Sequence, residues 1–302
     1  MKRNSRSARA VWLGLAFISP WLIGLLIFTL YPILASLYYS FCDYRVLSPP
    51  HWVGFRNYVE LFTDHDYFLK SLWNTAFMFL ELPLALACGL AIALLLNLKL
   101  RGMAFFRTVY YLPSVVPTVA ASILWLWLLN PDYGLVNKSL AFLHLPSTLT
   151  WLSDRFWAKP AFILMDLWSV GGGMIIYLAA LQGVPQHLYE AADLDGANAW
   201  DKLRHVTLPS ISPVIFFTLI LGLIGTFQYF TQAFVMTGGA NGTAGGPANE
   251  TLFYALYLYQ NAFQYFRMGY ACAMAWVLFI LTMIASLIVF RSSARWVYYE
   301  GG

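Results

Sequence analysis

The chain has 302 residues, of which 60% are hydrophobic, 18% aromatic and only 11% charged, and its net charge is +4. A soluble globular domain usually carries roughly 25% charged residues, and the apolar residues here come in long runs. The composition therefore excludes a soluble globular protein and indicates a membrane protein. No basic stripe with interleaved aromatics is present, which argues against nucleic-acid binding.

Six apolar windows are each long enough to cross a bilayer, which takes about 20 residues of helix. We therefore predict an all-α integral membrane protein, with 1–302 as a single transmembrane domain. The expected spans are approximately 11–41, 71–96, 103–129, 161–183, 212–236 and 268–290. Pro20 and Pro32 interrupt the first window, which we keep as one kinked span. The alternative for this window is a cleavable signal peptide, but the run is too long and no clear A-x-A site follows.

The placement of lysine and arginine predicts the orientation. With the N-terminus in the cytoplasm, eleven of the 18 basic residues lie on inside segments and seven on outside segments. Both termini and the segment 184–211 are therefore expected to face the cytoplasm. The positive net charge is an orientation signal in this reading.

The sequence offers no metal, redox or nucleotide site. Cys42, Cys88 and Cys272 are widely spaced, so we interpret them as small apolar side chains. The glycine-rich stretch 237–250 contains no lysine, whereas a phosphate-binding loop needs one to meet the terminal phosphates. We therefore expect no metal and no cofactor on this chain.

The cytoplasmic segment 184–211 interrupts the apolar sequence with four acids. Pro185 suits the first turn of a helix, and Gly196 a helix stop, so we predict a helix, a glycine turn and a second short helix. Trp200, Leu203 and Val206 are expected on one side of the second helix, which should end near Leu208-Pro209.

Two interpretations of this segment are open. A helix resting on lipid headgroups usually has a basic polar face, whereas anionic lipid would repel the four acids, which are Glu190, Asp193, Asp195 and Asp201. Ala191 and Ala192, expected on the exposed side, would permit another surface to approach closely. Docking onto a protein is therefore favoured over docking onto lipid.

The segment EAADLDGANAWDKLRHVTLP resembles the EAA loop of ABC-transporter permease subunits, whose pattern is EAA-x-x-x-G, nine residues, then I-x-LP. Val206 stands where the family usually has isoleucine, and Leu203 replaces a common phenylalanine. Segments 74–97, 105–137, 177–197 and 254–275 also look like binding-protein-dependent sugar permeases of the maltose, glycerol-3-phosphate and lactose type. The resemblance covers about 70–290, and no large inserted domain separates the early spans.

The resemblance implies a set of partners and a coupling site. The two short helices would sit in a cleft of a cytoplasmic ATPase, and the residues that carry over are Glu190, Ala191, Ala192, Asp195 and Gly196. The chain would pair with a second, homologous permease, a dimer of ATPases that hold ATP and Mg, and an extracytoplasmic sugar-binding protein. It would lie in a bacterial inner membrane as part of a permease heterodimer.

Polar side chains within spans are functional candidates, because they are expensive in lipid. Sugar sites combine polar groups for hydroxyls with aromatic faces, and the candidates for the substrate pathway are Asp166, Trp168, Gln228, Tyr229 and Gln232. Polar contacts between helices are the alternative for these residues. For Glu81, a structural role in serving a backbone group freed by Pro83 is favoured, and a functional role is the alternative. For Gly171–Gly173 we leave open a bend that lines the pathway and close packing against the partner permease.

We conclude from the sequence that the chain is a permease subunit that passes a carbohydrate inward, powered by ATP hydrolysed on other chains. It is not expected to be an enzyme, since it contains no H-E-x-x-H and no grouping of nucleophile and base. The alternative is an ion-coupled secondary transporter that acts alone, for which Glu81 and Asp166 are the only intramembrane support.

Overall fold

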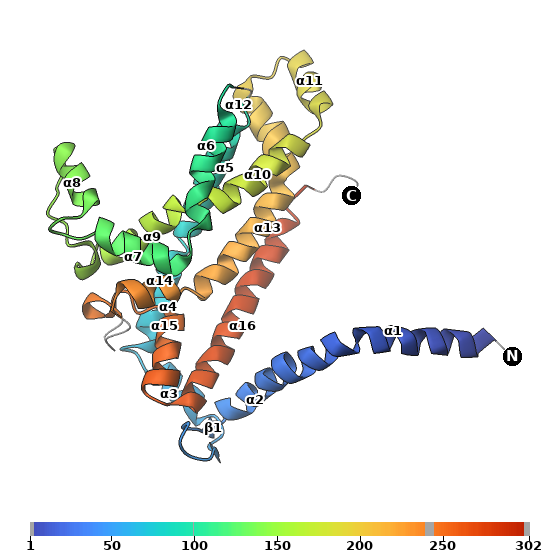
Figure 1. The fold of residues 1–302 in the computed structure, drawn as a ribbon, viewed down its shortest axis with the longest axis vertical. Helices are drawn as coiled ribbons and strands as arrows, with labels where there is room; N and C mark the ends of the chain where they lie inside the picture. The colour runs from blue at the N-terminus through green and yellow to red at the C-terminus, as the bar shows by residue number, and fades with distance from the viewer. Residues whose placement is uncertain (1–2, 99, 239–244, 299–302) are drawn as a thin grey trace. The chain divides into compact units, whose positions relative to one another are not determined.

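Figure 1 shows the chain as a computed structural model, which describes residues 3–98, 100–238 and 245–298. The protein is built from helices, as predicted, because a backbone in lipid must satisfy its own hydrogen-bonding groups. One antiparallel pair of two-residue strands, β1 with β2, accompanies the helices in the described residues.

The α-helices and strands are α1 Arg3–Leu25, α2 Tyr31–Ser40, β1 Cys42–Asp43, β2 His51–Trp52, α3 Arg56–Thr63, α4 Phe68–Met78, α5 Glu81–Leu96, α6 Met103–Val115, α7 Thr118–Leu128, α8 Leu135–Phe142, α9 Ala158–Trp168, α10 Gly171–Gly183, α11 Gln186–Leu194, α12 Ala199–Lys202, α13 Leu208–Phe227, α14 Thr231–Met236, α15 Tyr254–Tyr259 and α16 Met268–Ser293. Single 3₁₀ turns lie at Trp151–Ser153 and Pro247–Asn249, and five-residue π turns at Leu26–Leu30, Leu203–Thr207 and Gln260–Gln264.

The chain divides into two compact units. The first unit holds residues 1–63 and 258–277, and the second holds 64–257 and 278–302. The single domain over 1–302 stays a prediction.

In the first unit, Trp12–Ser40 is one continuous helix of 29 residues and includes the two prolines of the first predicted span. A π turn, Leu26–Leu30, immediately precedes Pro32. Such a wide turn suits a proline, which has no N–H and whose ring crowds the carbonyl four residues earlier. The chain after Ser40 is anchored by Asn57, whose side-chain amide donates to the carbonyls of Ser40 at 2.8 Å and Cys42 at 2.9 Å.

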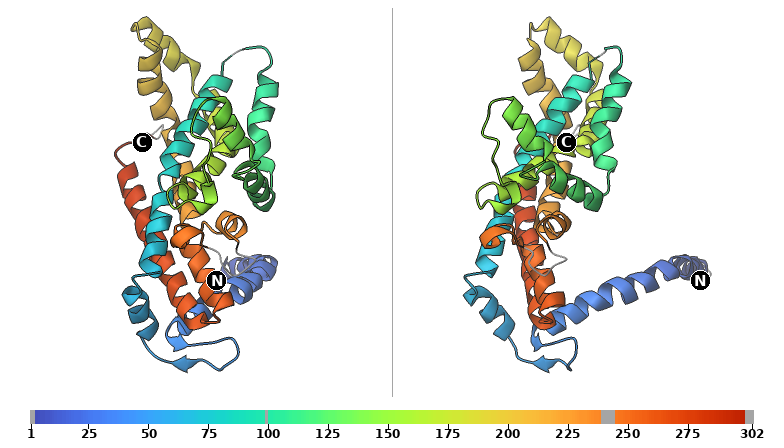
Figure 2. Two further views of the ribbon diagram at one scale, coloured as in Figure 1. Left: turned by 90° about the vertical axis from the view of Figure 1, so that its left-hand side faces the viewer. Right: turned by 60° about the vertical axis from the view of Figure 1, so that its left-hand side comes forward.

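The core of the second unit lies where α5, α10 and α13 pack together, and α6 packs along α10 (Figures 1 and 2). Its buried side chains include Ala93 and Leu96 of α5, Tyr177 of α10 and Ile211 of α13. Tyr177 donates or accepts a hydrogen bond of 2.6 Å with Thr218, which satisfies two hydroxyls inside an apolar bundle.

Four continuous helices are long and apolar enough to span a membrane, and two bent pairs raise the number to six if each pair is one span. The predicted span 103–129 is broken, because α6 and α7 meet at 98°. Val116 is extended there, since it precedes Pro117 and a residue before proline avoids the helical region. The predicted span 161–183 is the pair α9 and α10, bent by 45°.

The predicted span 212–236 has different limits in the structure. The helix that contains it begins at Ala199 and ends at Phe227, and α14 is a separate short helix. Our prediction that the second cytoplasmic helix ends near Leu208-Pro209 is therefore wrong. A π turn, Leu203–Thr207, precedes Pro209 as another precedes Pro32, and the helix continues through Pro209 and Pro213.

Candidate functional site

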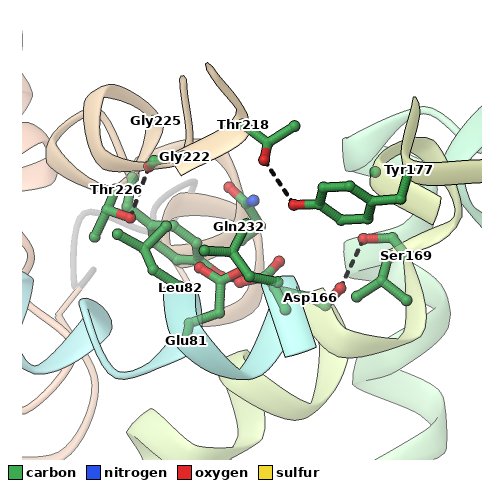
Figure 3. Close-up of a pocket in the computed structure, with 15 residues that line it drawn as sticks. Glu81, Leu82, Asp166, Ser169, Tyr177, Thr218, Gly222, Gly225, Thr226 and Gln232 are labelled. Carbon is green, nitrogen blue, oxygen red and sulfur yellow. Dashed lines mark hydrogen bonds between the residues drawn. The ribbon is translucent and has the colours of Figure 1, made fainter. Parts of the chain in front are cut away.

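A cavity of about 380 Å³ lies in the second unit, between α5, α9, α10, α13 and the link from α13 to α14 (Figure 3). Two carboxylates, Glu81 and Asp166, line it together with hydroxyl, phenol and amide groups. No lysine, arginine or histidine lines it among the residues that the structure describes. Its polar lining residues are Glu81, Asp166, Ser169, Tyr177, Thr218, Thr226, Tyr229 and Gln232.

Asp166 is held at the cavity by a hydrogen bond from Tyr229, which lies in the break between α13 and α14. It lies two residues before the end of α9, and the Tyr229 hydroxyl donates to its Oδ2 at 2.8 Å. Tyr229 follows the end of α13 and is itself buried, with its ring edge-on to Phe162 and Phe253 at centroid distances of 5.9 and 5.1 Å. Two interruptions of helices thus bring a carboxylate and a phenol together inside the bundle.

Gly171, at the bend between α9 and α10, lies against the backbone of α6. A Cβ atom there would stand 2.3 Å from the carbonyl oxygen of Tyr110 and 2.8 Å from the Cα of Tyr111, both in α6. Only glycine permits such an approach of two backbones. The structure therefore gives Gly171 a third role beside the two left open, which is close packing within the chain, at a bend whose break includes Ser169 of the cavity.

The position of Glu81 supports the functional alternative for this residue. Pro83 is the third residue of α5, where its missing N–H would have no helical partner in any case. Glu81 does not have to serve a freed backbone group, and it lines the cavity with Asp166 (Figure 3). Sequence reasoning undervalued this residue; an acid in the middle of an apolar run was the signal that could have found it.

A second, smaller cavity of about 140 Å³ shares Asp166, Ser169 and Gln232 with the first. Trp168 lines this second cavity, with its ring edge-on to Trp125 at 6.2 Å. Gln228 follows α13 as an exposed residue and is not among the residues that line these two cavities. Of the predicted pathway residues, the structure brings Asp166, Tyr229 and Gln232 together, places Trp168 next to them and leaves Gln228 apart.

The segment 184–211 forms the predicted helix and glycine turn. Helix α11 ends at Leu194, and Gly196 adopts a φ of +75°, the left-handed conformation that closes helices. The Ala197 N–H then donates to the Ala192 carbonyl at 2.9 Å, which satisfies an orphan acceptor of the last turn. Helices α11 and α12 lie together at one end of the second unit (Figures 1 and 2).

Two of the four acids in this segment have partners within it. Asp193 forms an ion pair with Lys202, and Asp201 completes a capping box with Asn198 at the start of α12. Glu190 is exposed and accepts a hydrogen bond from Gln186 at 3.0 Å, one turn earlier in the same helix. Asp195 is exposed at the end of α11, and neither it nor Glu190 has an ion pair among the described residues.

The exposed surface of the segment is more apolar than the sequence indicated. Trp200 was expected beside Leu203 and Val206; these two are partly buried, but Trp200 is 65% exposed. Leu194, at the end of α11, is 91% exposed. Ala191 is exposed as predicted, whereas Ala192 is half-buried under the turn that Gly196 makes.

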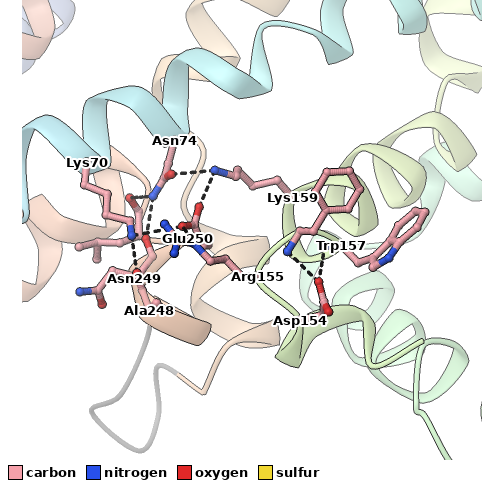
Figure 4. Close-up of polar contacts among 11 residues, drawn as sticks. Lys70, Asn74, Asp154, Arg155, Trp157, Lys159, Ala248, Asn249 and Glu250 are labelled. Carbon is pink, nitrogen blue, oxygen red and sulfur yellow. Dashed lines mark hydrogen bonds and ion pairs between the residues drawn. The ribbon is translucent and has the colours of Figure 1, made fainter. Parts of the chain in front are cut away.

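A polar cluster around Glu250 was not predicted from the sequence (Figure 4). Its carboxylate accepts hydrogen bonds from Lys159 at 2.8 Å and Arg155 at 2.6 Å, and Lys70 lies 3.3 Å away. Lys159 also donates to the Asn74 side chain at 3.0 Å and is only 8% exposed. The cluster therefore joins α4, the start of α9 and the end of the glycine-rich stretch 237–250, of which residues 239–244 lie outside the described residues.

The cations decide the ionisation of Glu250. Burial alone would raise its pKa, but the hydrogen bonds from Lys159 and Arg155, with the charge of Lys159 and the contact with Lys70, lower the pKa to about 2. The carboxylate is therefore charged at neutral pH, and the three cations around it leave an excess of positive charge.

Comparison with known proteins gives concordant matches. Residues 82–298 match the family described as binding-protein-dependent transport system inner membrane component. The chain is 40% identical over 301 residues to the probable ABC transporter permease protein YesP of Bacillus subtilis, with 99% of this chain and 96% of that protein covered. It is 36% identical to the lactose transport system permease protein LacF of Rhizobium radiobacter, with 93% of each covered. A chain in the crystal structure of a bacterial alginate ABC transporter, in complex with an alginate pentasaccharide-bound periplasmic protein, superposes with a TM-score of 0.82 at 25% identity, covering 97% of this chain and 98% of that one.

Proposed function

Because the chain belongs to the family of binding-protein-dependent transport system inner membrane components, we propose that sugar contacts it at the cavity of Glu81 and Asp166 and that ATP's work reaches it through α11 and Gly196. The protein is a multi-pass inner-membrane permease subunit of an ABC importer for sugars or oligosaccharides, and it works with a periplasmic sugar-binding protein. It is not itself an ATPase. The function predicted from the sequence is confirmed, and an ion-coupled transporter that acts alone is set aside.

The chemistry of the cavity supports its role as a sugar contact. Carboxylates accept hydrogen bonds from hydroxyls, and amides and phenols both accept and donate, so the lining matches the groups of a carbohydrate. The phenol rings of Tyr177 and Tyr229 add aromatic surface. The observation that carries the proposal is the meeting of Asp166, Tyr229 and Gln232 at one cavity, although they come from α9, from the link after α13 and from α14.

The shape of the segment after α10 supports its role in coupling. Glu190 and Asp195 are exposed acids without an ion pair among the described residues, and Leu194 and Trp200 add exposed apolar surface next to them. Such a surface suits a protein partner better than a lipid headgroup, because anionic lipid repels acids. We infer that Glu190, Ala191, Ala192, Asp195 and Gly196 form the contact with a cytoplasmic ATPase.

The finer partner assignments rest on the same reasoning. We propose a second, homologous permease beside this chain, an ATPase dimer that carries ATP and Mg, and a cytoplasmic location for both termini, as the placement of lysine and arginine indicates. Helix α6 supports a permease partner: it buries no residue, and the half-exposed Tyr110 and Tyr111 present phenol groups within a span. Polar groups within a span usually face protein rather than lipid.

The cavity is tested in the complete transporter, reconstituted with its ATPases and the sugar-loaded binding protein. We expect Asp166→Asn and Tyr229→Phe to reduce sugar uptake about tenfold, equivalent to about 1.4 kcal/mol, while ATPase stimulation by the binding protein is retained. Tyr133→Phe, at an exposed tyrosine away from the cavity, is the control. Uptake at the wild-type rate in both cavity variants would exclude the cavity as the sugar contact.

The coupling segment is tested in the same system with a different readout. Glu190→Gln removes the exposed charge, and Gly196→Ala places a side chain at a φ of +75°, which costs about 1–2 kcal/mol. We expect both to uncouple sugar-stimulated ATP hydrolysis while the binding protein still docks. Asp132→Asn, an exposed acid elsewhere, is the control. Normal coupling in both variants would refute the docking role.

A further inference from the structure

The first unit contains a polar cleft that is not part of the cavity proposed for sugar. It has a volume of about 240 Å³ and lies between the β1–β2 hairpin, α3 and the start of α16. Its lining includes three arginines and two acids, which are Arg45, Arg56, Arg267, Asp43 and Glu60. The volume is several times the share of about 30 Å³ that one water takes in the liquid, so a small polar group fits.

The cleft lies where two membrane spans end. The apolar helix Trp12–Ser40 stops immediately before β1, and the apolar helix Met268–Ser293 begins immediately after Arg267. The start of the second helix contacts the chain that follows the first, since the Gly269 N–H donates to the Tyr44 carbonyl at 3.0 Å. A Cβ on Gly269 would stand 2.0 Å from the Cys42 carbonyl oxygen, so no side chain fits between them. The cleft is therefore at the depth at which hydrocarbon gives way to headgroups.

Aromatic side chains mark the same depth. Trp52 and Phe55 are 62% and 70% exposed and pack on Phe41, which follows the end of the span, at centroid distances of 5.5 and 5.3 Å. Phe55 directly precedes Arg56 in the chain. Tryptophan and tyrosine gather at membrane interfaces because one part of the ring is apolar and another part is wet; Trp52 and Tyr38, 5.8 Å apart, fit that pattern.

The charged side chains of the cleft have a net positive charge that one anion would neutralise. Arg267 forms an ion pair with Glu60 and lies over the Tyr270 ring at 4.4 Å, while Arg45 is 3.9 Å from Asp43. Arg56 is exposed and has no ion pair among the described residues. Three cations against two acids leave one positive charge, which is the complement of a phosphodiester.

We propose that this cleft binds the phosphate of an anionic phospholipid in the leaflet where Ser40 and Met268 lie. Arg56 supplies the uncompensated charge, Arg45 and Arg267 flank it, and the exposed rings of Trp52 and Phe55 meet the lipid's apolar part. Guanidinium groups suit phosphate because their N–H groups match its oxygens. Phosphatidylglycerol is favoured over phosphatidylcholine, because choline brings a cation of its own to a cleft that is already positive.

The test uses the complete transporter in detergent and native mass spectrometry of the lipid that it retains. We expect the wild type to retain phosphatidylglycerol in preference to phosphatidylcholine, and Arg56→Gln to weaken that retention about tenfold, or about 1.4 kcal/mol. Lys138→Gln, at an exposed lysine outside the cleft, is the control and should leave retention unchanged. Arg56→Lys should restore part of the binding, since it keeps the charge and loses the planar fork.

Three outcomes would overturn the proposal. The first is equal retention of phosphatidylglycerol by Arg56→Gln and the wild type. The second is stabilisation of the wild type against heat by inorganic phosphate to the same extent as by phosphatidylglycerol, which identifies a free-anion site. The third is weaker docking of the binding protein to lipid-free Arg56→Gln complex with unchanged lipid retention, which identifies a protein contact. None of these readouts depends on sugar transport.

Discussion

Replacement of Gly171 by alanine should destabilise the bundle, whereas the same change at Gly172 should not. At Gly171 the new Cβ would meet the Tyr110 carbonyl oxygen at 2.3 Å and the Tyr111 Cα at 2.8 Å, and both contacts are backbone atoms that no rotamer change can move. At Gly172 the nearest atom would be the Ser114 Cβ at 3.9 Å, which is an ordinary contact. The two positions are neighbours in α10, so each is the control for the other.

The magnitudes follow from this geometry. Alanine is favoured over glycine in a helix by about 1 kcal/mol at most, so Gly172→Ala should leave stability unchanged or raise it by that amount. Overpacking typically costs about 1–3 kcal/mol. A Cβ at Gly171 would lie 2.3 Å from the Tyr110 carbonyl oxygen, so the backbones of α6 and α10 would have to move apart. We therefore expect Gly171→Ala to lose about 2 kcal/mol or more relative to Gly172→Ala.

The assay is thermal unfolding of the purified transporter followed by size-exclusion fluorescence, with sugar uptake measured in proteoliposomes. Because the bend at Gly171 adjoins Ser169 of the cavity, uptake should fall in Gly171→Ala even below its unfolding temperature. Equal unfolding temperatures and equal uptake for the two alanine variants would refute the close packing of α10 on α6.

Three further predictions concern the cluster at Glu250 and the cavity. Lys159→Met should cost about 3–5 kcal/mol of stability, because it removes a buried cation between Glu250 and Asn74; the exposed Lys138→Met is the control, and equal unfolding temperatures would contradict the prediction. Glu250→Gln should destabilise by about 3 kcal/mol at neutral pH, since a pKa lowered from 4.5 to about 2 stabilises the protein above the unfolded value. Its deficit should shrink as the pH falls from about 4.5 towards 2, and a constant difference from wild type in pH-dependent unfolding would count against it. Tyr229→Phe should leave stability within about 1.5 kcal/mol, the net worth of one hydrogen bond, and yet reduce sugar uptake; a large loss of stability would make the bond structural.

Local sequence was sufficient for the class of the protein and for much of its outline. Apolar runs of span length force helices, because lipid offers the backbone no partner, and the described structure is helical with four to six candidate spans. Gly196 ends α11 as predicted, since a helix stop requires a left-handed residue at one known position. The permease function also followed from sequence, through a motif of fixed spacing around Glu190.

Other features depend on contacts between distant segments. The sequence around Lys159 does not predict its ion pair with Glu250, which is 91 residues away. The position of Glu81 at the cavity likewise depends on α5 lying beside the end of α9. From the sequence alone, Gly171 predicts only a weakened helix. Its close packing against α6 is visible only in the structure. Pro209 does not end its helix, because the π turn Leu203–Thr207 lies just before it and makes room for the proline ring. The π turn Leu26–Leu30 precedes Pro32 in the same way.

The difference between the features that the sequence predicts and those that only the structure shows has a physical reason. Burial in lipid and helix termination are decided by a residue and its near neighbours, so the sequence of this protein determined its membrane location, its helical class and the turn at Gly196. Ion pairs, backbone approaches and cavities require two elements to meet at one place, and that meeting is a property of packing. The tertiary structure alone therefore brought Asp166, Tyr229 and Glu81 to one cavity and separated Gln228 from it.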